Sequence, residues 1–156
     1  MKKFELTNEF ITNMFGTKLF RIRALVEFGD VEAGELGGYV EKESNLGHDD
    51  NAWVYDNAWV YGNARVYGDA RVCGNGDYAY AHGFGSVNRT TTFFRLKDGG
   101  VGVRCGCFYG TLAQFRDKIR ETHGESAIAE EYLDLAALME KRFRRTGNEQ
   151  KTEEES

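Results

Sequence analysis

The strongest constraint on the fold is a six-residue repeat that runs through residues 51–74. Each unit opens with Asn or Asp, has Ala second and Val fourth, and closes with Asp or Gly. The four clear units are Asn51–Asp56, Asn57–Gly62, Asn63–Gly68 and Asp69–Gly74. Ala and Val lie two positions apart, so they point to one side of a short strand, and the turn residues then redirect the chain. A hairpin meander would leave almost no strand, so the spacing favours a coil with one unit on each flat face.

Two weaker units precede the clear ones. Residues 37–42 and 43–48 place Val40 and Leu46 in the aliphatic position. Asp49 and Asp50 then form a two-residue insertion at a corner. Six units make about two turns, and repeat folds need about three repeats and covered ends. We therefore expect the flanking segments or a second subunit to cover the coil.

The repeat resembles the hexapeptide-repeat family, whose members fold as left-handed parallel β-helices. The aliphatic and small positions match the family pattern at Val54, Val60 and Val66 with the alanines that follow. The position after the aliphatic residue departs from the pattern, because it holds Tyr or Cys. The resemblance implies a fold class that is mainly β, with a short left-handed parallel β-helix of about two turns over residues 37–78.

The flanks predict two further modules. Residues 1–36 form an N-terminal β cap, with Phe10–Phe15 and Lys18–Phe28 as a hairpin. Residues 86–143 form a C-terminal module with a hairpin and two α-helices. Its strands are residues 90–97 and 101–109. The first helix runs from a capping box at 111–114 to about His123, and the second runs from about Ser126 to Phe143. The polar residues 144–156 are predicted to be a disordered tail.

The complete layout also resembles a group of proteins common in bacterial phages and prophages. The matching segments are residues 19–25, 36–41, 90–94 and 105–110, together with the repeat. That resemblance implies an origin in a mobile element, and it assigns no catalytic residue.

Charge and cysteine content limit the partners. The formal net charge of -5 argues against a general nucleic-acid binder, which needs a surplus of Lys and Arg. No apolar run approaches the length of about 18 residues that spans a membrane. The first residues lack the apolar region of a signal peptide, and three cysteines are an odd number. We therefore expect reduced thiols in the cytoplasm of a bacterial host cell.

The first candidate site is a row of aromatic and arginine residues that alternates away from the Ala and Val positions. Such side chains are enriched at interfaces, so the row is a candidate binding surface. A flanking segment, a sister subunit, a foreign partner or a small ligand could cover it. With 18 residues in a turn, Arg71 would lie over Trp53 at cation–π distance. The row consists of Trp53, Tyr55, Trp59, Tyr61, Arg65, Tyr67 and Arg71.

The second candidate site is a polar cluster before and within residues 90–97. The cluster combines hydroxyls, an amide and guanidinium groups from Ser86, Asn88, Arg89 and Thr90, with Arg104 on the partner strand. Such groups can hold a phosphate-bearing small ligand. The alternative interpretation is a Thr-rich strand without a ligand.

Histidines and cysteines give weaker candidates. Many hexapeptide-repeat proteins are trimeric acyltransferases that use acyl-CoA and a histidine base, so His48 or His82 could be that base. Cys105 and Cys107 could contribute to a zinc site with Cys73 and one histidine, but two small buried thiols explain the pair equally well. No metal and no cofactor is predicted.

These observations favour a non-catalytic binding protein that forms a homo-dimer or homo-trimer. Its partner would be a host protein or a small signalling ligand, without a membrane and without direct contact to nucleic acid. One concrete version is an inhibitor of a bacterial defence system, of the anti-CRISPR or anti-signalling type. The alternatives are a trimeric acyltransferase and a self-assembling structural protein.

Overall fold

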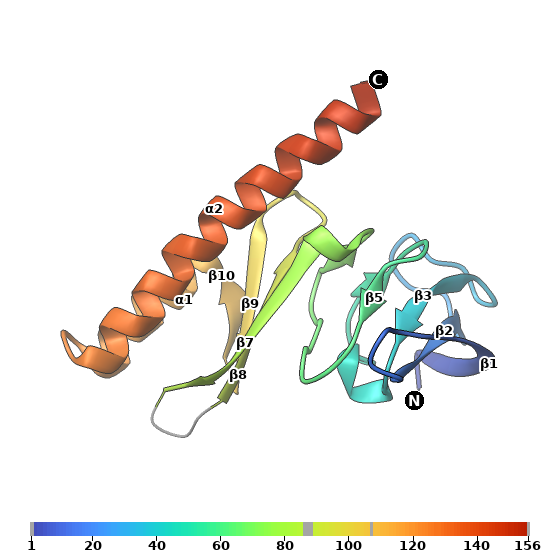
Figure 1. Cartoon of the computed structure of the whole chain (residues 1–156), viewed down its shortest axis with the longest axis horizontal. Helices are drawn as coiled ribbons and strands as arrows, with labels where there is room; N and C mark the ends of the chain where they lie inside the picture. Colours follow the sequence, from blue (N-terminus) through green and yellow to red (C-terminus); the bar gives the residue numbers. More distant parts are fainter. Residues whose placement is uncertain (1, 86–88, 107, 156) are drawn as a thin grey trace. The chain divides into compact units, whose positions relative to one another are not determined.

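The chain divides into two units, Met1–Asn75 and Gly76–Ser156. The computed structural model (Figure 1) describes residues 2–85, 89–106 and 108–155, without the side chains of residue 75 and residues 147–155. The N-terminal unit contains the repeat, and the C-terminal unit contains both α-helices. Within the described residues, the N-terminal unit has two sheets and the C-terminal unit has one, and each unit has its own buried residues.

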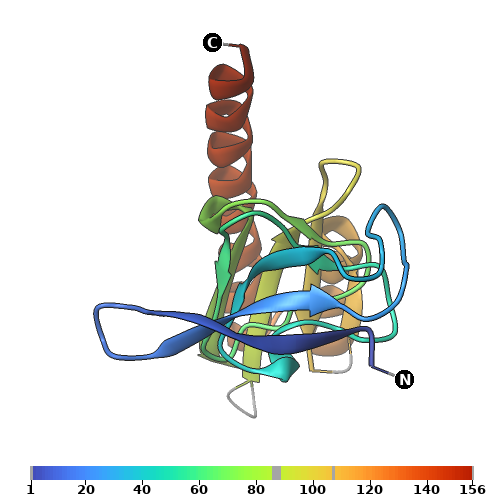
Figure 2. The same ribbon diagram turned by 90° about the vertical axis from the view of Figure 1, so that its right-hand side faces the viewer.

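The main sheet of the N-terminal unit has the strand order β1-β2-β3-β5. The hairpin predicted for residues 10–28 is confirmed, since β1 and β2 pair antiparallel from Phe4 opposite Ala24 to Thr12 opposite Lys18. Figure 2 shows this hairpin as a twisted ribbon that projects beyond β3. The β3 strand pairs antiparallel with β2 and parallel with β5, so the sheet is mixed. The strands are β1 (Phe4–Thr12), β2 (Lys18–Ala24), β3 (Leu36–Val40) and β5 (Trp59–Val60).

The repeat itself forms only short parallel pairings. Tyr39 pairs with Trp59, and the strand β4 (Trp53–Val54) pairs with β6 (Arg71–Val72) in a separate two-stranded sheet. A single bridge joins Leu46 to Val66. A 3-10 turn, Glu43–Asn45, precedes that bridge.

The predicted fold class, a mainly β protein with a left-handed parallel β-helix, is wrong. Among the residues that the structure describes, the strands form a mixed sheet, an antiparallel sheet and a two-stranded sheet beside two α-helices, and they do not form a solenoid. The protein is mixed α+β. The physical reason is that each of the four clear six-residue units supplies at most two residues of strand. In addition, β3 pairs antiparallel with β2 on its other side.

The expected interior positions of the repeat are nevertheless buried. The four valines at the fourth position are fully buried, and the four alanines at the second position are at most 3% exposed. Burying the valines contributes about 1.5–3 kcal/mol each relative to exposed side chains, before the entropy of ordering the chain is subtracted. The repeat pattern therefore predicted which side chains lie inside, although it did not predict the architecture.

One buried lysine near the N-terminus bonds to the two-residue insertion and to the repeat. Lys3 Nζ donates to the carbonyl oxygen of Ala52 at 2.6 Å and to the Asp50 carboxylate at 3.2 Å, and it lies over the Phe28 ring. Burial lowers the pKa of Lys3, while the charge of Asp50 acts in the opposite direction. The lysine therefore attaches the start of β1 to the repeat by polar bonds in addition to apolar contacts.

Gly38 allows β3 to pack directly against the repeat. A Cβ atom at this position would lie 2.5 Å from the carbonyl oxygen of Ala58 and 2.7 Å from a methyl group of Val54. We expect Gly38→Ala to lower the free energy of unfolding by about 2 kcal/mol, because a backbone oxygen cannot move aside as a side chain can. Gly74→Ala is the control, since no atom lies within 4 Å of its Cβ position. Equal urea midpoints for the two variants would contradict the packing at Gly38.

The sheet of the C-terminal unit is antiparallel throughout, with the order β10-β9-β8-β7. The predicted hairpin of residues 90–109 is confirmed by β8 and β9, but its second half is split near Gly106, and β7 was not predicted. A 3-10 turn, Asn75–Asp77, precedes β7. The strands are β7 (Tyr78–Phe84), β8 (Arg89–Arg95), β9 (Val101–Cys105) and β10 (Phe108–Thr111).

Both predicted helices are present, and they pack on one face of this sheet (Figure 1). The helix α1 (Leu112–His123) begins with the predicted capping box, in which Thr111 and Gln114 bond to each other's backbone N–H groups, and Gly124 follows its last residue. The helix α2 (Ala127–Glu155) continues through residues 144–155, where the sequence predicts a disordered tail. Phe93 on β8, Phe115 on α1 and Phe143 on α2 belong to the common core.

Arg95 joins this sheet to α2. Its guanidinium donates to the buried Asp77 carboxylate, to the carbonyl oxygen of Phe143 and to the hydroxyl of Thr146, each at 2.9 Å. Its Cζ atom also lies 5.2 Å from the centre of the Phe143 ring. One side chain thus holds the strand and the helix in a fixed relation.

Candidate functional site

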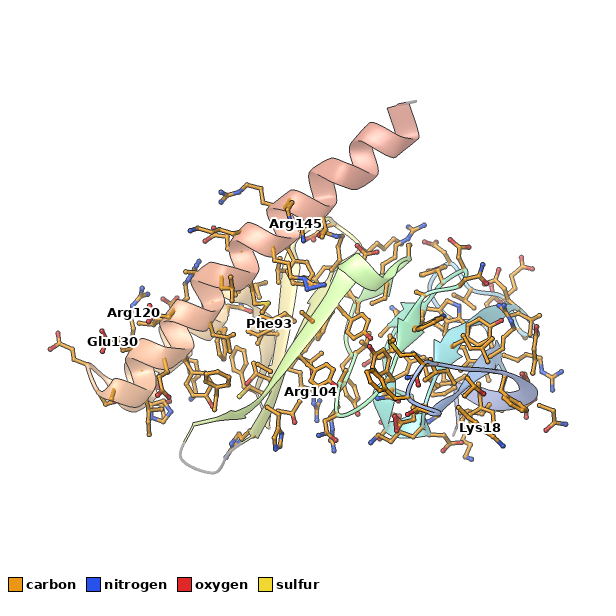
Figure 3. All side chains as sticks on the ribbon, viewed as in Figure 1. Lys18, Phe93, Arg104, Arg120, Glu130 and Arg145 are labelled. Carbon is orange, nitrogen blue, oxygen red and sulfur yellow. The ribbon has the colours of Figure 1, made fainter. Side chains whose placement is uncertain are left out.

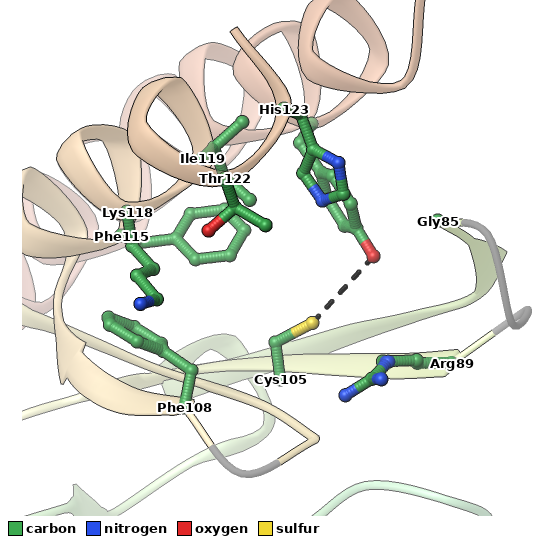
Figure 4. Close-up of a pocket in the computed structure, with 10 residues that line it drawn as sticks. Gly85, Arg89, Cys105, Phe108, Phe115, Lys118, Ile119, Thr122 and His123 are labelled. Carbon is green, nitrogen blue, oxygen red and sulfur yellow. Dashed lines mark hydrogen bonds between the residues drawn. The ribbon is translucent and has the colours of Figure 1, made fainter.

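The C-terminal unit contains a cavity of about 340 Å³ between α1, the first turns of α2 and the adjacent ends of β8 and β9 (Figure 4). It is lined by Gly85, Arg89, Cys105, Phe108, Phe115, Lys118, Ile119, Thr122, His123 and Tyr132.

A thiol and two hydroxyl groups form a connected polar group at the cavity. Thr91 Oγ1 donates to the sulfur of Cys105 at 3.3 Å, and this sulfur lies 3.8 Å from the Tyr132 hydroxyl (Figure 4). The pKa of Tyr132 is raised to about 12, mainly by burial and secondly by the neighbouring Cys105. The hydroxyl therefore keeps its proton at physiological pH and can donate a hydrogen bond there.

Aromatic rings form the apolar wall. The Phe115 ring meets Tyr132 edge-on at 5.7 Å and is tilted against Phe108 at 5.8 Å. His123 stacks on the outer part of this group, with its ring 6.1 Å from Tyr132. The edge-on and tilted contacts hold the rings at fixed angles, so the wall does not depend on a ligand for its shape.

Two cationic side chains lie at the cavity. Arg89 comes from the start of β8 and Lys118 from α1, and Figure 4 shows them on opposite sides of Cys105. No hydrogen bond or ion pair joins either cation to another residue that the structure describes. The absence of a side chain at Gly106 leaves room for Arg89, because a Cβ atom there would overlap the guanidinium group. The described lining residues include cations and no carboxylate, so the electrostatic field favours an anion.

The structure divides the predicted polar cluster. Residues alternate between the two faces of β8, and Thr92 pairs with Arg104 while Thr91 pairs with Cys105. Arg89 therefore lies on the helix-covered face, where it lines the cavity. Arg104 lies on the other face, as Figure 3 shows. Thr90 also lies on that other face, where its hydroxyl bonds to His82 at 2.7 Å. Ser86 and Asn88 lie outside the described residues.

The first residue of the predicted binding surface on the repeat, Trp53, is not accessible. Trp53 is fully buried, with Phe4 and Phe28 packed edge-on against its ring, so the N-terminal strand and the loop after β2 cover it. Arg71 pairs with Trp53 along the backbone, but its guanidinium lies over the Tyr55 ring at 5.0 Å.

The other members of that row are more accessible. Tyr55, Trp59 and Tyr67 are half-buried, while Tyr61, Arg65 and Arg71 are exposed. Their role as a binding surface remains a prediction.

The histidines predicted as alternative bases have separate surroundings. His48 Nδ1 accepts a hydrogen bond from the backbone N–H of Lys3, and its ring stacks on Phe4 at 4.3 Å. His82 is exposed and bonds to Thr90. Among the described residues, no group of three or more His, Cys, Asp or Glu could hold a metal ion, and Cys107 lies outside them.

The cavity was not predicted, because the sequence of α1 was recognised only as that of a capped helix. The signal was present in the spacing of Phe115, Ile119 and Thr122, which places them on one face of a helix. Lys118 and His123 flank this face. Arg89 was predicted as a ligand-binding residue, and the structure places it at the cavity, but with different neighbours.

No protein-family model and no curated protein matches this chain. No helix within the described part of the chain is long and apolar enough to cross a membrane.

Proposed function

We propose that the protein is a non-catalytic binding protein that takes up a small molecule in the cavity of its C-terminal unit. The observation that carries the proposal is this cavity, which has an aromatic wall and two cations and no carboxylate among its described lining residues. Pockets for small molecules are concave, mostly apolar and supplied with a few polar groups that orient the ligand. Sequestration of a host molecule would fit the mobile-element origin that the sequence layout implies.

The proposal can be tested by blocking the cavity. Thr122 lies on the exposed side of α1 and still lines the cavity, so Thr122→Trp should fill the space without disturbing the core. Glu121→Trp adds the same bulk to the neighbouring exposed position, which does not line the cavity. We expect anilinonaphthalene sulfonate, an aromatic anion whose fluorescence rises on binding, to bind the full chain and Glu121→Trp saturably. Thr122→Trp should bind it at least about tenfold more weakly, a loss of about 1.4 kcal/mol.

The experiment has two unfavourable outcomes. One is the absence of saturable binding to the full chain. The other is equal affinity in Thr122→Trp and Glu121→Trp, which would place the dye elsewhere. Circular dichroism of both variants should match that of the original chain, so that a loss of binding is not a loss of folding.

A further inference from the structure

We infer that the ligand is an amphipathic organic anion, with its carboxylate or phosphate group at Arg89 and its apolar body against the adjoining rings of Phe108 and Phe115. The inference rests on the proposed function and adds the chemical class and orientation of the ligand. It follows from the uneven distribution of polar and apolar groups around the cavity.

One end of the cavity is polar. Arg89 supplies a guanidinium group whose planar arrangement of donors matches the oxygens of a carboxylate or phosphate. Figure 4 shows the Cys105 sulfur on the side of Phe108 that faces Arg89, the Tyr132 hydroxyl lies 3.8 Å from this sulfur, and His123 stacks on Tyr132. Because the pKa of Tyr132 is raised to about 12, its hydroxyl is a neutral donor beside the cation. These groups stabilise a negative charge, with Arg89 at the exposed side of the cavity and Cys105 and Tyr132 buried beside it.

The other end is apolar. Phe108, Phe115 and Ile119 line it, and the two rings are held by their mutual contact and by Tyr132. Lys118 is exposed, so it can remain in solvent while its methylene groups extend the apolar wall. An alkyl or aryl body would remove this surface from water, which is the main source of affinity in such sites.

The size of the cavity limits the ligand. A volume of about 340 Å³ is near the small end of the range of about 300–1,000 Å³ found for small-molecule pockets. A medium-length acyl chain or a single substituted ring fits this volume better than a large cofactor does. One anionic head group on such a body is the simplest ligand that satisfies both ends.

Four compounds with the same eight-carbon chain separate the effects of the head group and the chain. Octanoate and octyl phosphate are anions, octanol is neutral and octylamine is a cation. In calorimetric titrations of the full chain, we expect at least one anion to bind about tenfold more tightly than octanol, and octylamine to bind most weakly. The ranking of octanoate and octyl phosphate identifies the head group. Equal binding of octanol and both anions would overturn the inference and leave the proposed function standing, whereas no binding of any compound would overturn both.

Matched arginine variants test the position of the head group. Arg89→Gln should bring the affinities for octanoate and octyl phosphate to that of octanol, and should leave octanol binding unchanged. Arg120→Gln removes the same charge from an exposed α1 residue that does not line the cavity, and should keep the preference for anions. Phe108→Ala should weaken all compounds that bind by a similar factor. Retention of the preference for anions in Arg89→Gln would overturn the assignment of the head group to Arg89.

Discussion

Arg95→Met should lower the free energy of unfolding of the C-terminal unit by about 3–5 kcal/mol, the cost of breaking a buried ion pair from one side. The substitution removes the hydrogen bonds to Asp77, Phe143 and Thr146, and it leaves the Asp77 carboxylate almost fully buried without this cation. Methionine keeps the apolar part of the side chain against the Phe143 ring, so the loss reports mainly on the charge and its hydrogen bonds. Both α-helices belong to this unit, so far-ultraviolet circular dichroism during urea unfolding is a suitable measurement.

A second substitution separates the buried charge from the lost contacts. In the Arg95→Met background, Asp77→Asn removes the carboxylate charge, and we expect it to recover part of the stability. Asp77→Asn alone should be destabilising, because it weakens the bond with Arg95. Strictly additive effects of the two substitutions would contradict a direct interaction.

Trp53→Ala should destabilise the N-terminal unit by about 3–5 kcal/mol, the usual range for removing a large aromatic side chain from a core. Trp53 is fully buried, and it contacts Phe4 from β1 and Phe28 from the loop after β2. Its removal therefore leaves a cavity where three segments meet. The remaining Trp59 lies in the same unit and supplies the fluorescence signal for urea unfolding.

The equivalent substitution in the next repeat unit is the control. Trp59 occupies the same position of the six-residue pattern, but it is only half-buried. Trp59→Ala should therefore cost clearly less than Trp53→Ala, with Trp53 as the fluorescence signal. A larger loss in Trp59→Ala would mean that Trp53 does not lie in the core.

The repeat shows what a periodic pattern can and cannot predict. Alternation correctly identified the buried Val and Ala positions, because burial depends on which side of the local chain a residue faces. It failed for Trp53, because an outward side chain becomes buried when another segment covers it. It also failed for the architecture, since the pairing of β3 with β2 joins segments that share no repeat.

Local signals were more reliable than long-range ones. The capping box at Thr111, the stop at Gly124 and the β8–β9 hairpin are determined by a few neighbouring residues, and all are confirmed. The cavity is formed by the start of β8, the end of β9 and parts of two helices, so the set of residues that line it depends on tertiary packing. Sequence spacing therefore indicated Arg89 as a binding residue but paired it with Arg104, which the alternation of β8 and β9 places on the opposite face.

The insertion at residues 49–50 shows how a repeat can tolerate a change in length. Between Trp53 and Arg71 the parallel partners are 18 residues apart, whereas Leu46 and Val66, on either side of the insertion, are 20 apart. Asp50 offsets the disturbance with its own oxygens, which accept from the backbone N–H groups of Ala52 at 3.1 Å and Gly68 at 2.7 Å. An added acidic residue can thus satisfy the donors that its own insertion displaces. Length variation in such chains should therefore be concentrated at corners where the extra residue carries a short side-chain acceptor such as Asp or Asn, because a residue without an acceptor would leave those donors to water.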